Sequence, residues 1–137
     1  MNSSEFFSLI VKPTAEEYLR ERYDIRRGCL AAIVLNQMAD YWCKEVVTMT
    51  PTGLRKSVCI ERPDFSLIWD VADATKHSRL DRGSRTVSDS EQISRPPGMF
   101  QAPFGTALFR EAIVVNVALD DGSVRALHDA VISVLSM

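Results

Sequence analysis

The stretch PDFSLIWDVADATKHSRL, residues 63–80, predicts the helix around which the rest of the chain is organised. Pro63 suits the first turn of a helix, because its φ angle is fixed and its missing N–H needs no partner there. Gly83, shortly after this stretch, is a natural helix stop. We therefore expect a helix that begins at Pro63 and ends before Gly83.

One polar stripe runs along this predicted helix. At about 100° per residue, Ser66, Asp70, Asp73 and His77 point to the same side. Apolar residues border the stripe on both sides, whereas a solvated face is normally bordered by more polar residues. The stripe therefore predicts an interior groove or a seam between helices. Asp73 and His77 are four residues apart, within hydrogen-bonding reach, and a carboxylate beside an imidazole orients it.

Three interpretations of the stripe remain open. It is a buried polar network that ties helices together, or an active site in which Asp70, Asp73 and His77 are catalytic and His77 moves protons. In the second case Lys76, next to His77, is the candidate substrate-binding residue. The third is a metal site in which His128 joins the two aspartates and His77. The sequence has no His-x-x-x-His pair and no Gly-rich phosphate loop, so we predict no metal and no cofactor.

Before this stretch, the sequence predicts one long helix over residues 15–45. Thr14 and Glu17 have the spacing of a capping box at its start, and the segment 48–53, with its proline, marks its end.

The middle of the first helix, residues 29–35, is apolar on all sides. A helix without a polar face is surrounded by protein, either its own chain or a partner subunit. We therefore expect a homo-oligomer that forms through this first long helix. Gly28, directly before the segment, marks a kink or a close helix contact.

After residue 80 the pattern changes. Residues 81–98 are rich in Arg, Ser, Asp and Pro and predict a long mobile loop. Large apolar residues then alternate over 113–119, which predicts a strand. Asp121-Gly122 is a strong hairpin signal, and a short returning strand is expected over 124–126. Residues 128–137 predict a terminal helix, and 99–106 is a candidate third strand at the sheet edge.

Together these elements predict a single α+β domain over residues 1–137 that is mainly α. Its architecture is two long antiparallel helices packed with a small antiparallel sheet and a short C-terminal helix. No stretch approaches the roughly 20 apolar residues that a membrane span needs, so no membrane association is expected. Three isolated cysteines, Cys29, Cys43 and Cys59, are expected to be free thiols, which favours the cytoplasm.

The segment LIWDVADATKHSRL, with Ala72-Asp73-Ala74 and Lys76-His77, followed by Asp121-Gly122, resembles small helical proteins of bacteria and phages. The resemblance covers roughly residues 60 to 135. Such proteins are similar in layout to the HEPN class of helical bundles, many of which are ribonuclease toxins or RNA-binding modules. The HEPN catalytic pattern needs an Arg with four to six residues between it and its His, and neither His77 nor His128 has one.

Two functional hypotheses follow from the sequence. The first is a small, non-catalytic, self-associating interaction protein of bacterial or phage origin. The alternative, implied by the resemblance, is a HEPN-like nucleic-acid-processing enzyme of the ribonuclease type that uses His77 with Asp73. The chain has 16 basic and 18 acidic residues, for a net charge of -2. This balance does not support nucleic-acid binding, although it leaves room for a local basic patch.

Overall fold

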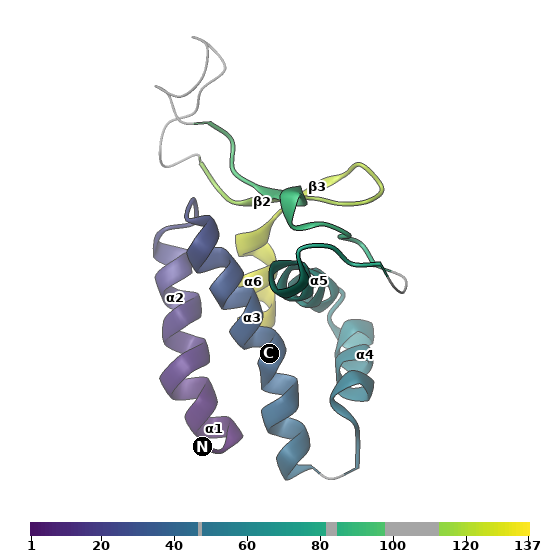
Figure 1. Cartoon of the computed structure of the whole chain (residues 1–137). Coiled ribbons are helices and arrows are strands. Elements are labelled where there is room, and N and C mark those ends of the chain that lie inside the picture. The colour runs from purple at the N-terminus through teal and green to yellow at the C-terminus, as the bar shows by residue number, and fades with distance from the viewer. Residues whose placement is uncertain (47, 82–84, 98–112) are drawn as a thin grey trace.

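The computed structural model describes residues 1–46, 48–81, 85–97 and 113–137 of the 137-residue chain. The fold is α+β and mainly α, as predicted: helices form the body, and a small antiparallel sheet covers one end of them (Figure 1). The elements are α1 (Ser3–Phe6), the π-helical turn η1 (Phe7–Val11), α2 (Lys12–Arg20), α3 (Ile25–Glu45), α4 (Pro51–Glu61), α5 (Asp64–His77), the 3-10 turn η2 (Ser90–Gln92), β1 (Ile93–Ser94), β2 (Asn116–Ala118), β3 (Val124–Ala126) and α6 (Leu127–Leu135).

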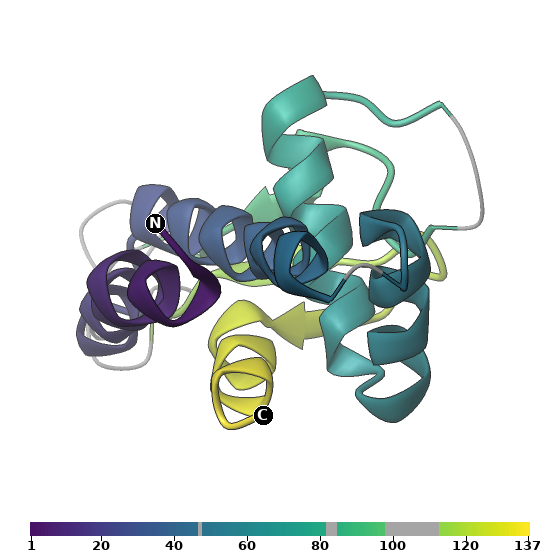
Figure 2. The ribbon, with the colours of Figure 1, turned by 90° about the horizontal axis from the view of Figure 1, so that it is seen from below.

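Helix α3 is the centre of the fold. It packs against α2, α4, α5 and α6, and the view from below shows α1 and α2 on one side of it and α4 on the other (Figure 2). The antiparallel neighbour of α3 is α2, whereas α5 crosses it (Figures 1 and 2). Residues 29–35, which are apolar on all sides, are largely covered by other parts of the same chain, because Ala31, Ala32 and Leu35 are buried in the core.

The predicted helix over 15–45 is wrong in two respects. The chain is already helical from Ser3, and a π-helical turn directly precedes α2, whose second residue, Pro13, cannot donate a backbone hydrogen bond. The helix then breaks after Arg20, and α3 starts afresh with Asp24 as its N-cap, whose side chain accepts a hydrogen bond from the Arg27 backbone N–H at 3.1 Å. The prediction therefore merged two helices into one.

The segment 48–53 does not simply end a helix, as predicted, because a further helix starts inside it. Thr50 is the N-cap of α4, and its hydroxyl accepts from the Gly53 backbone N–H at 3.1 Å. Pro51 occupies the first helical position, where a missing N–H costs nothing. Pro51, which was interpreted as marking the end of the preceding helix, is therefore also the first residue of the next one.

The second half of the chain follows the prediction closely. Helix α5 follows Pro63, and β3 spans the expected residues. Both strand pairs are antiparallel in the order β1-β2-β3, with Val117 of β2 opposite Ile93 on one side and Arg125 on the other. Gly122 has a φ of 88°, the left-handed conformation that the Asp-Gly turn requires.

The third described strand is β1, which pairs with β2. Residues 99–106, the candidate edge strand, lie outside the described part of the chain. None of the described helices is both long and apolar enough to span a membrane. The three cysteines are free thiols, as predicted.

Candidate functional site

The polar stripe of α5 does not form a single site. Asp70 is only 6% exposed and Asp73 is half-buried, whereas His77, the last residue of the helix, is exposed. Ser66 lies in the first turn of α5, where its hydroxyl donates a hydrogen bond to the backbone carbonyl of Pro63 at 2.7 Å. The four residues therefore face three different environments.

Asp70 anchors the segment that follows α5. Its Oδ2 accepts two hydrogen bonds from Thr86, from the backbone N at 2.7 Å and from the hydroxyl at 2.8 Å. Its Oδ1 lies 3.4 Å from Nη1 of Arg85. A buried carboxylate needs such partners to offset its loss of hydration.

Asp73 belongs to the same network. Its Oδ2 accepts from Nη1 of Arg85 at 2.8 Å, so one guanidinium group lies between two carboxylates of α5. The predicted loop over 81–98 is thus folded onto the helix in its described part, residues 85–97. This arrangement favours the interpretation of the stripe as a buried polar network, although its partner is the following segment and not another helix.

The expected pairing of Asp73 with His77 does not form. Asp73 bonds to Arg85, and the imidazole of His77 makes no hydrogen bond or ion pair with any side chain that the structure describes. Lys76, the candidate substrate-binding residue, is exposed beside it. The geometry does not assemble an oriented general acid or base at this end of α5.

The alternative metal site is not assembled either. No group of three His, Cys, Asp or Glu side chains is placed to hold a metal ion within the described ranges. His128 lies at the start of α6, where its Nε2 is 3.2 Å from Oδ1 of Asp129. Burial lowers the pKa of His128, while Asp129 acts in the opposite direction.

Arg85 and Thr86, which the sequence analysis assigned to a loop, help to line a cleft of about 680 Å³. Its walls come from α4, α5 and the segment after α5. We call this hollow the polar cleft; the lining residues are Thr52, Lys56, Cys59, Ile60, Ser66, Trp69, Asp70, Arg85 and Thr86.

The thiol in the polar cleft is not activated. Burial and the nearby Asp70 carboxylate both raise the pKa of Cys59. The protonated thiol is a poor nucleophile, so the cleft offers binding groups and no thiolate for covalent chemistry.

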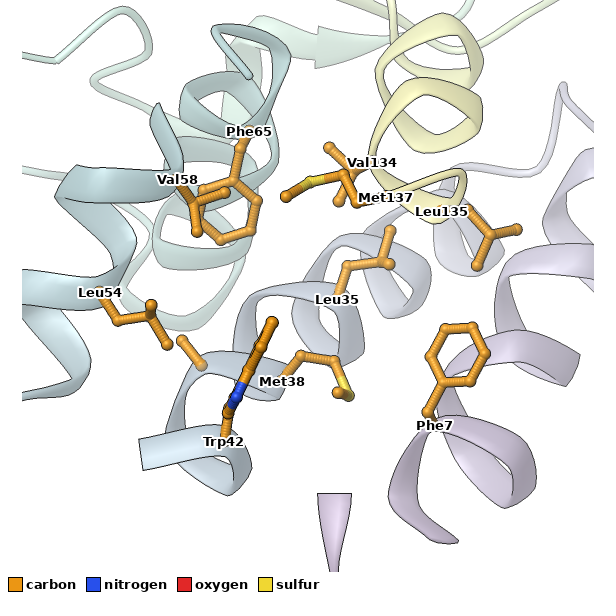
Figure 3. A pocket seen from close by; sticks show the side chains of 11 residues that line it. Phe7, Leu35, Met38, Trp42, Leu54, Val58, Phe65, Val134, Leu135 and Met137 are labelled. Atoms are coloured by element: carbon orange, nitrogen blue, oxygen red, sulfur yellow. The ribbon is translucent and has the colours of Figure 1, made fainter. Parts of the chain in front are cut away.

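A second hollow lies at the opposite end of the helices from the sheet. Figure 3 shows side chains from η1, α3, α4, α5, α6 and the residues just after α6 converging around it. Its volume is about 200 Å³, and buried Leu35, Phe65 and Val134 form part of its wall. We call it the apolar groove; the lining residues are Phe7, Leu35, Met38, Ala39, Trp42, Leu54, Val58, Phe65, Val134, Leu135 and Met137.

The apolar groove continues past Trp42 into a smaller hollow of about 160 Å³. Trp42 and Leu54 line both, and Val46 and Met49 extend the apolar surface beyond them. Trp42 is 51% exposed and Met137 is 55% exposed. A soluble chain rarely leaves so many large apolar side chains together in water without a use for them.

Comparison with protein-family models, with curated proteins and with solved structures gives no match for this chain. The two hollows and the network between α5 and residues 85–86 are therefore the basis on which a function is argued.

Proposed function

We propose that this chain is a small self-associating interaction protein, in which two copies meet through the apolar groove. The observation that carries the proposal is the position of Trp42, half-exposed between two apolar hollows. Trp is the residue type most enriched among the side chains that dominate binding energy at protein interfaces.

The chemistry of the apolar groove is that of an interface core. The side chains of all eleven lining residues are apolar. Charged residues are depleted at the core of protein interfaces, while aromatic residues and Met are enriched. Met38 and Met137 add flexible side chains that adapt to a partner surface.

The exposed apolar area also fits a second protein. The exposed fractions of Phe7, Trp42, Val46, Met49 and Met137 amount to on the order of 450 Å², if a large side chain presents about 150–250 Å². A standard interface buries about 800 Å² on each partner, of which a little over half, again roughly 450 Å², is non-polar. The area on this face is thus what a moderate dimer interface requires.

A second copy is the partner that the shape favours. The commonest oligomer is a two-fold dimer, in which the same patch serves on both subunits and must complement itself. Here one face carries both a hollow and, in the wall of that hollow, a half-exposed aromatic side chain, so the Trp42 rings of two copies can pack against the grooves of one another.

The proposed interface includes residues of the helix that was predicted to mediate self-association, but it lies nearer the C-terminal end of that helix than predicted. Residues 29–35 were expected to form it, yet Ala31, Ala32 and Leu35 are buried by the chain's own helices. The exposed apolar side chains gather at the other end of α3, around Trp42 and Met38. No contact favours the alternative, a nucleic-acid-processing enzyme, because Asp73 and His77 do not meet among the described contacts.

The proposal is tested by the mass of the protein in solution. We expect light scattering coupled to gel filtration, over a range of concentrations, to show a dimer for the wild-type chain and a monomer for Trp42→Glu. Met137→Glu provides a second disruption at a residue that follows α6 and is 55% exposed, where the substitution should not disturb folding. Circular dichroism checks that each variant is folded.

Leu30→Glu is the matched control, because Leu30 is 41% exposed on the same helix but lies outside the groove. It should remain dimeric. A wild-type chain that is monomeric at every concentration contradicts self-association. A dimer that is disrupted by Leu30→Glu but not by Trp42→Glu places the interface at residues 29–35 and contradicts the groove.

A further inference from the structure

We propose that the polar cleft binds a small aromatic anion, meaning a planar ring that carries a phosphate or carboxylate group. This site is separate from the proposed self-association surface, because the polar cleft and the apolar groove share no lining residue. The cleft combines one cation without a salt-bridge partner among the described residues, a rigid polar wall and an aromatic platform.

Lys56 supplies the charge. It is exposed on α4, and its ammonium group makes no salt bridge with any residue that the structure describes. Thr52 lies one helical turn before it, and both side chains line the cleft. An ammonium group next to a hydroxyl is a suitable partner for a phosphate or carboxylate oxygen.

The opposite wall is fixed in place, and its charges are largely paired. Arg85 lies between the carboxylates of Asp70 and Asp73, and Thr86 donates two hydrogen bonds to Asp70. Arg85 offsets one of the two carboxylate charges, and the two hydrogen bonds from Thr86 disperse the other, so an incoming anion meets a weaker repulsion than an unpaired carboxylate would exert. The charge of Lys56 is therefore left for a ligand.

Trp69 supplies the platform. Its indole is half-buried in the cleft wall, and the guanidinium carbon of Arg85 lies 6.0 Å from the ring centroid. Aromatic rings stack on such a surface with a gain beyond that of area burial alone. Ile60, also in the wall, is 83% exposed and gains apolar contact when the cleft is filled.

The dimensions agree with a ligand of this size. The cleft has a volume of about 680 Å³, within the range of roughly 300–1,000 Å³ for small-molecule sites. Its walls are mainly apolar, with a few polar groups that fix orientation, which is the usual composition of such sites. Inorganic phosphate alone leaves the aromatic and apolar walls unused.

The test uses adenosine 5′-monophosphate and 2-naphthoate as the two anionic probes, measured by isothermal titration calorimetry. Adenosine and inorganic phosphate are the controls for ring and anion. The full chain with Trp42→Phe keeps Trp69 as its only tryptophan, so quenching of its fluorescence by adenosine 5′-monophosphate localises binding to the cleft. Lys56→Gln should weaken each bound probe roughly tenfold or more.

Lys12→Gln is the matched control, since Lys12 is an exposed lysine on α2 outside the cleft, and it should leave affinity unchanged. Binding of either anion that depends on Lys56 supports the proposal and shows which anionic group is preferred. The proposal is overturned if neither anion binds, if Lys56→Gln binds as tightly as wild type, or if adenosine or inorganic phosphate binds as tightly as adenosine 5′-monophosphate. These outcomes are independent of oligomeric state and leave the dimer test unaffected.

Discussion

The carboxylate of Asp70 accepts two hydrogen bonds from Thr86, one from its backbone N at 2.7 Å and one from its hydroxyl at 2.8 Å. Sixteen residues separate the two along the chain. The backbone N of Asp120 in turn donates to the Thr86 carbonyl at 2.8 Å. Thr86 therefore links the central polar position of α5 to the turn between β2 and β3.

Replacing Asp70 should be costly. In Asp70→Ala, the Thr86 N–H and the Arg85 guanidinium lose their acceptor, so we expect unfolding in urea to lose about 2–4 kcal/mol. Asp81→Ala removes a carboxylate whose ion pair with Arg79 is almost fully solvated, and a change below about 0.5 kcal/mol is expected there. If both variants are equally stable, the network does not hold the segment after α5.

Asp73 and His77 give a second comparison on the same helix. Asp73→Ala breaks the 2.8 Å bond to Arg85, and the expected loss is about 1–3 kcal/mol. His77→Ala should change stability by less than about 0.5 kcal/mol, because the side chain is exposed. Thermal unfolding of both variants checks this order. A large loss in His77→Ala that matches the loss in Asp73→Ala would mean that the two residues act as a pair after all.

The same residues show how far sequence reasoning reached. The helical spacing of about 100° per residue is enough to predict that Asp70 and Asp73 face a protected environment, because the apolar residues that border the polar stripe of α5 are close to it in sequence. Their partner was not predictable in this way. Arg85 comes from a stretch with few large apolar residues, and only the tertiary fold brings it back over α5.

The boundaries of the helices and strands were likewise predictable only where the local sequence signals them. Helix α5 and the β2–β3 hairpin carry strong local signals in Pro63 and Gly122, and both were predicted. The break between α2 and α3 carries only the weaker signal of Asp24, a favourable N-cap residue, since no glycine or proline lies there. It is set by the side chain of Asp24 and by Arg27, whose Nη1 lies 2.5 Å from Glu21. The apolar groove was missed because the exposure of Trp42 depends on how α4 and α6 pack around α3, which no local pattern in the sequence gives.

Gly28 lies where α2, α3 and α6 pack closely together, which leaves little room for a side chain at this position. A Cβ at this position would lie 2.9 Å from Cδ2 of Leu127 and 3.1 Å from the ring of Tyr18. Tyr18 is fully buried and cannot withdraw. We therefore expect Gly28→Ala to destabilise the fold by about 1–3 kcal/mol, although alanine favours helix.

The control for Gly28→Ala is a double-mutant cycle with Leu127→Ala, which removes the nearest contact. The penalty of Gly28→Ala should shrink in that background. A stabilising effect of Gly28→Ala in the wild-type chain would contradict close packing and leave helix propensity as the only effect.

His128 gives the fold a dependence on pH near neutrality. Its side chain is only 13% exposed, its Nδ1 is buried without a hydrogen-bond partner in the described structure, and burial lowers its pKa from the usual 6.5 although Asp129 acts to raise it. The unfolded chain therefore takes up a proton near pH 6.5 before the folded chain does. Stability from this group is present above that pH and falls as the pH drops below it. We expect the slope of unfolding free energy against pH to flatten in His128→Gln, measured by urea titration. An unchanged slope in that variant would assign the dependence to other groups.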